Sequence, residues 1–218
     1  MLLRVLRALG GSHAVARIVV ATDRADVLAG LPYCGKPVTV VPAANGPSAS
    51  VAQVLRSEGA PLLVTTADHA LLQSDWIDEF VFATRNGNAD AWVALARSEA
   101  VMAAAPGTQR TWLRFSDGAY SGCNLFLLRT AATLGIVQLW QQLEAERKRP
   151  LTLLRRLGLL HALRYRFGWL SLAQAMERLG RLAGARIAPV VLSDGRAAID
   201  VDKPADLDLV RELVRNSA

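Results

Sequence analysis

The fold is decided by the stretch Leu62-Leu63-Val64-Thr65-Thr66-Ala67-Asp68, in which an apolar run of strand-forming residues stops at a carboxylate. A later segment, Ala198-Ile199-Asp200-Val201-Asp202, repeats this arrangement, and helix-forming residues follow both segments. In open α/β sheets the ligand crevice lies at the carboxyl ends of the strands. We therefore expect the two aspartate-bearing segments to face one crevice.

Carboxylates that converge in such a crevice are suited to Mg²⁺, which proteins usually hold with one or two carboxylates and substrate phosphates. Asp68 and Asp202 are the first candidates as ligands and as catalytic residues. Asp200 is a further metal candidate, because strand alternation would point it the same way as Asp202. The alternative interpretation makes Asp68 and Asp202 ordinary helix N-caps.

Composition places few limits on the class of protein. The 218 residues are 52% hydrophobic, which suits a single domain with a large core or one domain with an insertion. Cys34 and Cys123 form neither a disulfide framework nor a metal-binding spacing, so we expect reduced thiols in a cytoplasmic protein. No uncharged run is long enough to predict a transmembrane helix, and no signal peptide is recognised.

The positive charge is concentrated in one segment. Residues 144–186 contain ten Arg or Lys and three Glu, a net charge of +7, whereas the whole chain carries +6. A local basic excess favours an anionic partner for this segment. No pattern typical of nucleic-acid-binding domains accompanies it, so no nucleic-acid partner is expected.

The order of elements predicts an α/β fold. Apolar runs and intervening amphipathic segments alternate through the first half of the chain, which is typical of a mostly parallel sheet with crossover helices. We expect a helix over 2–10, strands at 17–22, 38–42, 61–65 and 89–95, and helices through 51–55 and 76–84. A hairpin is expected at 111–128, around Asp117-Gly118. The rest of the chain is predicted as a helical insertion over 131–183, broken at Pro150 and Gly168, then strands at 187–192 and 197–199 and a C-terminal helix over 207–213.

Three segments, taken in order, resemble the MobA-like nucleotidyltransferases, a family with a GT-A-type, Rossmann-like fold. Residues 64–71 (Val-Thr-Thr-Ala-Asp-His-Ala-Leu) resemble the strand that ends at the metal-binding Asp. Residues 120–126 (Tyr-Ser-Gly-Cys-Asn-Leu-Phe) resemble the Gly-x-Asn strand that meets the acceptor. Residues 199–207 resemble the element in which the second metal Asp precedes Lys/Thr-Pro. The resemblance covers nearly the whole chain and implies a single nucleotidyltransferase-like domain over residues 1–218.

The resemblance implies a reaction and further site residues. The expected reaction is Mg²⁺-dependent transfer of a nucleotidyl group from a nucleoside triphosphate, GTP or CTP first, to a small anionic acceptor, with release of pyrophosphate. The turn containing Ser48 and Ser50 would contact the base and ribose, although either serine could instead cap the following helix. Gly122 and Asn124 would meet the acceptor.

Several cations are candidates for the anionic group of the acceptor. These are Arg110 together with Lys148 and Arg149, and Arg114 as a further candidate; the alternative is that they are solvated surface cations. Residues 151–172 mix apolar residues with arginines. This stretch is interpreted either as a helical unit that packs on its own core or as a peripheral contact with an anionic membrane surface.

One departure from the family pattern matters. The family begins with a strand and a glycine-rich loop, whose backbone N–H groups and basic residue would hold the triphosphate, whereas this sequence matches the family from the following helix onward. We expect a start codon assigned too far downstream. The alternative is a non-catalytic binding protein that has lost this loop.

A second alternative is a glycosyltransferase of the same fold that uses a nucleotide-sugar. Many of these enzymes carry a metal-binding Asp-x-Asp motif. Here the matching residues, Asp200 and Asp202, lie near the C-terminal end of the sequence rather than in its middle, which disfavours this alternative. Release of pyrophosphate or of a nucleoside diphosphate would separate the two reactions.

Overall fold

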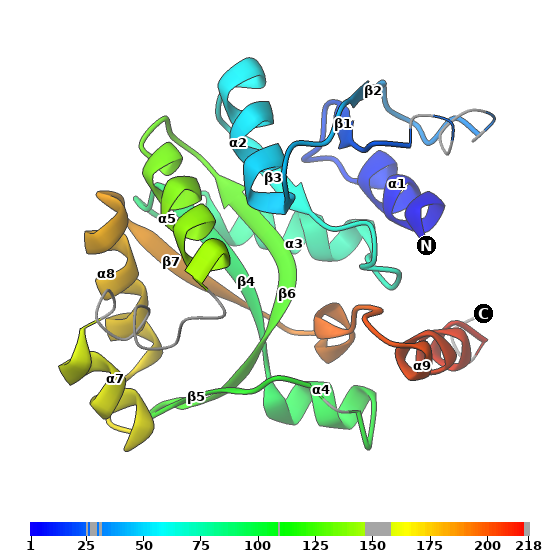
Figure 1. The fold of residues 1–218 in the computed structure, drawn as a ribbon. Coiled ribbons are helices and arrows are strands. Elements are labelled where there is room, and N and C mark those ends of the chain that lie inside the picture. The colour runs from blue at the N-terminus through cyan, green and yellow to red at the C-terminus, as the bar shows by residue number, and fades with distance from the viewer. Residues whose placement is uncertain (25, 27–29, 31, 109, 147–157, 216–218) are drawn as a thin grey trace.

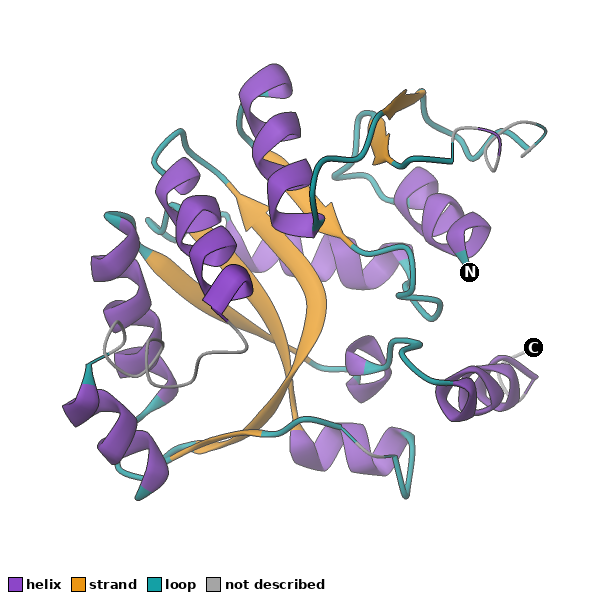
Figure 2. Ribbon diagram, in the orientation of Figure 1, coloured by secondary structure: helices purple, strands orange, loops and turns teal. Residues whose placement is uncertain are grey.

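The computed structural model describes residues 1–24, 26, 30, 32–108, 110–146 and 158–215. It has the predicted mixed α/β architecture, with helices packed on both faces of a twisted central sheet (Figures 1 and 2). This arrangement agrees with the Rossmann-like fold expected from the sequence.

The main sheet described has five strands, of which four share a direction and one, β6, is reversed. Its order is β3 (Leu62–Thr65), β6 (Gly118–Leu128), β4 (Ala91–Arg97) and β7 (Ile187–Leu192), and β5 (Leu113–Phe115) pairs with β6. β4 and β7 are parallel, whereas β6 is antiparallel to β3, β4 and β5. The predicted hairpin is therefore confirmed, and its long arm is inserted into the centre of the sheet. A separate parallel pair is formed by β1 (Ile18–Ala21) and β2 (Val38–Val41).

The helices follow the predicted order with one addition. They are α1 (Leu2–Gly11), α2 (Pro47–Glu58), α3 (Ser74–Thr84), α4 (Ser98–Ala104), α5 (Thr133–Glu146), α7 (Leu159–Arg166), α8 (Leu172–Ala183) and α9 (Pro204–Arg215). The short helix α4 was not expected. The predicted break at Gly168 separates α7 from α8, and this glycine has a φ of +72°. The predicted break at Pro150 lies outside the described residues.

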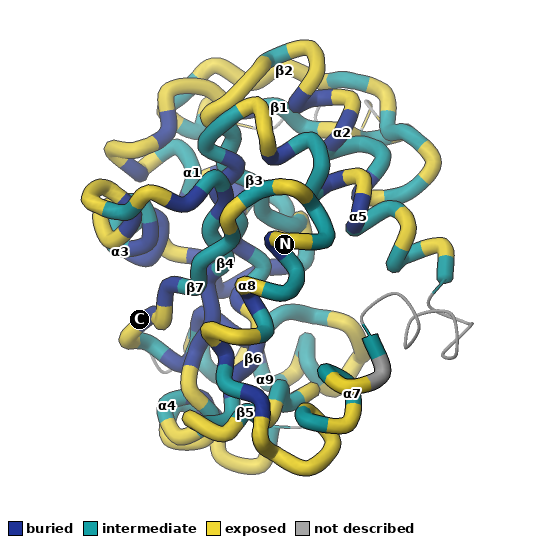
Figure 3. Tube along the Cα trace, turned by 90° about the vertical axis from the view of Figure 1, so that its left-hand side faces the viewer, coloured by how far each residue is buried: buried dark blue, intermediate teal, exposed yellow. Residues whose placement is uncertain are grey.

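Alternation along the strands divides the core into two faces. On β4, Ala94 and Ala96 belong to the large cluster that packs against α1 and α3, in which Phe80 is fully buried. The intervening Leu95 turns to the opposite face and packs with α8. Side chains of neighbouring strand residues point to opposite faces of a sheet. The buried residues accordingly gather along β4, β6 and β7 in the middle of the molecule (Figure 3).

One predicted strand is wrong. Residues 197–199 do not pair with the sheet; Gly195–Ala198 form a 3₁₀ helix, η2, whose N-cap Asp194 accepts a hydrogen bond from the Arg196 backbone N–H. η2 packs directly on α4: a Cβ on Gly195 would lie 2.2 Å from the backbone carbonyl of Ala100. Because the chain turns away from the sheet here, Asp200 and Asp202 lie on a loop before α9, and the strand-alternation argument for Asp200 does not apply.

Candidate functional site

Asp68 lies in the turn that follows β3, where the sequence predicted it. The Thr66 hydroxyl donates a hydrogen bond to Oδ1 of Asp68 and so orients the carboxylate. The Asp68 backbone carbonyl accepts hydrogen bonds from the N–H of Ala70 at 2.8 Å and of Val201 at 3.3 Å. The bond to Val201 joins the two aspartate-bearing segments directly. The tertiary structure therefore brings the segments together as expected, although the second is a loop.

The second segment holds a nearly buried polar network. Nη2 of Arg110 lies 2.5 Å from Oδ1 of Asp200, and the two side chains are 10% and 14% exposed. The other oxygen of Asp200, Oδ2, accepts a hydrogen bond from Nδ2 of Asn124 at 2.6 Å. One network is thus formed by Arg110 on the α4–β5 connection, Asn124 on β6 and Asp200 before α9. The sequence had identified each of them separately.

A β-bulge in β6 positions Asn124. The register pairs Val93 with Phe126 and Leu95 with Gly122, so residues 123–125 of β6 lie opposite Ala94 alone. Asn124 has a φ of +48°, the left-handed conformation that Asn tolerates better than most residues. Bulges often re-aim a side chain beside a functional site. Here the bulge places the Asn124 amide on Asp200.

Asp202 is the exposed carboxylate of the group. The neighbouring negative charge of Asp200, then desolvation and the charge of Asp68, raise the pKa of Asp202 above its ordinary value. The three carboxylates therefore share one region of negative potential, as a cation site requires. Asp206 serves the helix instead, because its Oδ2 accepts hydrogen bonds from the backbone N–H groups of Asp202 and Lys203 at 3.1 and 2.8 Å.

These carboxylates fit a magnesium site of the two-carboxylate kind. Among the described residues, no group of three or more His, Cys, Asp or Glu is arranged to hold a metal ion by itself. Mg²⁺ does not need such a cage, because it commonly keeps several waters and binds one or two carboxylates together with substrate phosphates. Asp68 and Asp202 can fill this role, whereas both oxygens of Asp200 contact protein donors.

His69 is a core residue at the edge of the site. Its side chain is fully buried and stacks on Trp76, with ring centroids 6.3 Å apart. Burial lowers the pKa of His69 from 6.5 to about 4, against the opposing charges of Asp200 and Asp68, so the imidazole is neutral near pH 7. Neither ring nitrogen makes a regular hydrogen bond within the described residues. These features do not favour a metal ligand.

Ser48 and Ser50 lie in the first turn of α2 rather than in the turn before it, and both hydroxyls have structural partners. Ser48 is 3% exposed and its hydroxyl donates to Glu144 of α5. The Ser50 hydroxyl donates to the Gly46 carbonyl at 3.1 Å and accepts from the Ala44 N–H at 2.9 Å. Neither serine caps α2, whose N-cap is Gly46. The alternative interpretation as a serine N-cap is therefore wrong, and nucleotide contact by these serines stays a prediction.

The remaining candidates are Gly122 and the cations Arg114, Lys148 and Arg149. Gly122 is exposed on β6, with no heavy atom within 4 Å of where a Cβ would stand, so a ligand can approach the backbone closely. Arg114 is exposed on β5, and none of the hydrogen bonds of the described residues joins it to the Asp200 network. Lys148 and Arg149 lie outside the described residues, and their role in acceptor binding stays a prediction.

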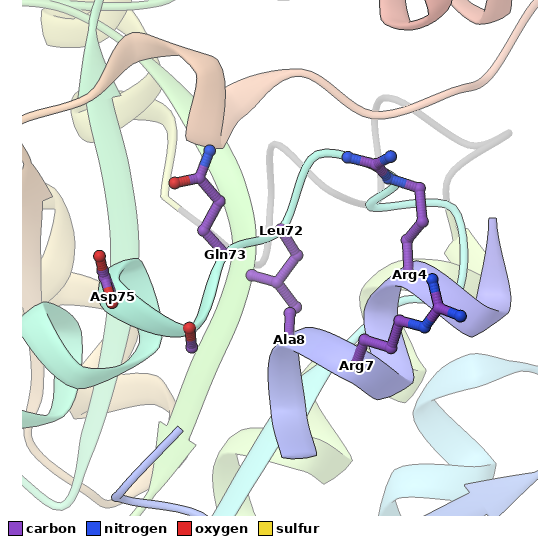
Figure 4. Close-up of a pocket in the computed structure, with 7 residues that line it drawn as sticks. Arg4, Arg7, Ala8, Leu72, Gln73 and Asp75 are labelled. Atoms are coloured by element: carbon purple, nitrogen blue, oxygen red, sulfur yellow. The ribbon is translucent and has the colours of Figure 1, made fainter. Parts of the chain in front are cut away.

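Arg4 of α1 was not predicted from the sequence. Its Nε donates to the Ala70 carbonyl at 2.8 Å, which anchors α1 to the turn after Asp68. Arg4 and Arg7 also line a shallow pocket of about 420 Å³, closed on the other side by Leu72 and Gln73 before α3 (Figure 4). No carboxylate of the Asp68–Asp202 group lines this pocket. The spacing of residues in α1 indicated only its apolar stripe. Nothing in the sequence predicted the hydrogen bond from Arg4 to Ala70.

The sheet order and the helices on both of its faces define an α/β protein of the Rossmann-like class. The chain belongs to the MobA-like NTP transferase domain family, whose family model matches residues 1–197. A comparison with curated protein sequences found no match.

Solved structures share this fold. A hypothetical transferase from Thermus thermophilus is 27% identical with a TM-score of 0.72, over 88% of this chain and 98% of that one. The synthetase for CMP–2-keto-3-deoxy-manno-octonic acid, complexed with CTP, is 16% identical with a TM-score of 0.60, over 100% of this chain and 88% of that one. The 4-diphosphocytidyl-2C-methyl-D-erythritol synthase from Anaerococcus prevotii is 9% identical with a TM-score of 0.60, over 98% and 85%. The last two likenesses show the fold alone.

Proposed function

We propose that this protein transfers a nucleotidyl group from a nucleoside triphosphate to a small anionic acceptor. An acceptor oxygen forms a bond to the α-phosphorus, the bond from that phosphorus to the bridging oxygen breaks, and pyrophosphate leaves. The observation that carries the proposal is the meeting of Asp68, Asp200 and Asp202 beside Arg110 and Asn124. Such a site needs no side-chain nucleophile, because positioning and charge stabilisation supply most of phosphoryl-transfer catalysis.

Each group has a distinct proposed role. Asp68 and Asp202 would hold Mg²⁺, which when bound supplies Lewis-acid stabilisation of charge on phosphate oxygens. Asp200 is committed to Arg110 and Asn124, which favours a positioning role for it over direct metal binding. The guanidinium N–H groups of Arg110 that do not face Asp200 would bind the anionic group of the acceptor.

The nucleoside triphosphate substrate is proposed from what similar structures bind. One of the similar structures is described as a complex with CTP, so CTP is the first nucleotide to assay and GTP the second. A glycosyltransferase reaction would use a nucleotide-sugar on the same fold and would release a nucleoside diphosphate. Family membership favours nucleotidyl transfer.

The test is pyrophosphate release from CTP and GTP with Mg²⁺ and a panel of phosphomonoester acceptors. Asp202→Asn should lower the rate by roughly 10²–10⁴-fold, because it removes a metal ligand and its charge stabilisation. Asp208→Asn is the matched control: Asp208 lies six residues further on, within α9, is 76% exposed and pairs only with Arg211 in the described salt bridges. Equal rates for the two variants, or nucleoside diphosphate as the product, would contradict the proposal.

A further inference from the structure

Among the described residues, an exposed apolar surface lies on α7 and the turn that follows it. Leu160, Leu163 and Phe167 are 67%, 45% and 60% exposed, and Trp169 is 67% exposed. Positions 160, 163 and 167 lie on one face of a helix by their spacing. The Phe167 and Trp169 rings stack with centroids 5.3 Å apart. We call these four residues the aromatic face.

On its other side α7 contacts β5 and α8 through a few side chains. The Tyr165 ring packs edge-on against Phe115 of β5 at 5.6 Å, and its hydroxyl accepts a hydrogen bond from the Arg114 N–H at 3.3 Å. Arg164 donates to Gln174 of α8 at 3.0 Å. These contacts place α7 beside β5 and α8 and leave the aromatic face exposed. Large apolar side chains grouped on a surface commonly mark an interaction site.

The sequence around the aromatic face is basic. Between Glu146 and Glu177 the sequence contains seven Arg or Lys residues and no Asp or Glu. Two of these cations, Arg164 and Arg166, lie in the last turn of α7 beside Phe167. Aromatic residues with flanking arginines match the boundary between headgroups and acyl chains, where Trp is favoured and cations meet anionic lipid.

The aromatic face is separate from the carboxylate site. α7 lies at one side of the molecule, and the loop from η2 to α9 that carries Asp200 and Asp202 lies at the other (Figure 1). A surface bound at α7 therefore need not cover that loop. No described helix is both long and apolar enough to cross a bilayer, so a contact through this face would be peripheral.

We propose that the aromatic face and its flanking arginines dock this protein on an anionic lipid surface. Phe167 and Trp169 insert at the interface, and the exposed Arg166 meets the headgroup phosphates. This assignment is independent of the proposed nucleotidyl transfer, because it concerns residues outside the carboxylate site and is measured without turnover.

The experiment is flotation of the full chain with vesicles of phosphatidylcholine, or of phosphatidylcholine and phosphatidylglycerol in equal parts. The protein should float with the anionic vesicles, less at high salt because exposed charges are screened, and should stay unbound with phosphatidylcholine alone. The double variant Phe167→Ser/Trp169→Ser should lose flotation. Phe82→Ser is the matched control, because Phe82 is 66% exposed on α3, and it should float like the wild type.

Two further measurements separate the contributions. Arg166→Gln should weaken binding to anionic vesicles about fivefold, the expectation for one cation near an anionic surface. Tryptophan emission should shift to shorter wavelength on adding anionic vesicles, and Trp169→Phe should abolish that shift. Absence of flotation by the wild type, or equal loss with Phe82→Ser, overturns the proposal. Sedimentation that shows self-association lost only in Phe167→Ser/Trp169→Ser, without flotation, would assign the face to a second copy of the chain instead.

Discussion

Arg110 and Asp200 form an ion pair almost hidden from solvent, with Nη2 2.5 Å from Oδ1 and side chains 10% and 14% exposed. A pair at this depth contributes little net stability, since desolvation offsets the attraction, but loss of one partner leaves the other charge uncompensated. The pair also joins the α4–β5 connection to the loop before α9. We therefore regard it as the element that holds the acceptor side of the site in shape.

The ion pair predicts a selective effect of Arg110→Lys. Lysine keeps the charge but lacks the planar fork that contacts Asp200 and a second anion together. We expect the KM for a phosphomonoester acceptor to rise by roughly tenfold, with the KM for the nucleotide nearly unchanged. Arg85→Lys, at the cation–π contact with Phe82 on the surface, is the control. A rise in the nucleotide KM alone would assign Arg110 to the triphosphate.

The bulge predicts that Asn124 has two separable roles. Asn124→Ala removes the amide and also places an alanine at a φ of +48°, which costs about 1–2 kcal/mol in the left-handed region. Asn124→Gly removes the amide without that backbone penalty. Thermal melting should therefore rank the glycine variant above the alanine variant, while both lose acceptor binding. If alanine is as stable as glycine, the positive φ is not a property of the folded protein.

Burial of His69 predicts a pH-dependent stability. Its pKa falls from 6.5 to about 4 on folding, so between these values the unfolded chain binds more protons than the folded one. Stability then rises with pH across this window: the contribution is complete above pH 6.5 and lost as pH falls to 4, by at most about 3 kcal/mol.

The measurement is the urea midpoint at pH 5 and pH 7.5. His69→Phe, which keeps a ring on Trp76, should reduce the difference between the two midpoints. Phe80→Leu, at another fully buried position, should lower both midpoints equally. An unchanged pH dependence in His69→Phe would assign the acid sensitivity to carboxylates instead.

Packing of η2 on α4 predicts that Gly195 cannot carry a side chain. A Cβ would lie 2.2 Å from the Ala100 carbonyl carbon and oxygen, and such overpacking costs about 1–3 kcal/mol. Gly195→Ala should lower the melting temperature and, because η2 leads into the Asp200 loop, also lower the rate of pyrophosphate release. Gly11→Ala is the control, since its Cβ would meet only the Ser74 side chain at 3.4 Å. A loss of stability without loss of rate would uncouple η2 from the site.

The order of strands and helices could be predicted from the sequence because it depends on local information. Apolar runs, amphipathic spacing and the Asp117-Gly118 turn each act over a few residues. They predicted the α/β class, the hairpin and the break at Gly168. The same reasoning failed at residues 197–199, because an apolar run with strand character forms a strand only if a partner edge is free. Here η2 packs on α4 instead, a helix that local patterning did not reveal.

The sequence by itself also identified the candidate carboxylates Asp68 and Asp202 and named Asn124 and Arg110 as separate candidates. It could not show that Asp200 joins the last two, because that contact depends on a bulge in β6 and a loop brought together by distant segments. Residue types and spacing thus determined the class of fold and the kinds of group in the site. Which groups meet was decided only by tertiary packing, since hydrogen bonds and ion pairs act over a few ångströms in space, whatever the separation along the chain.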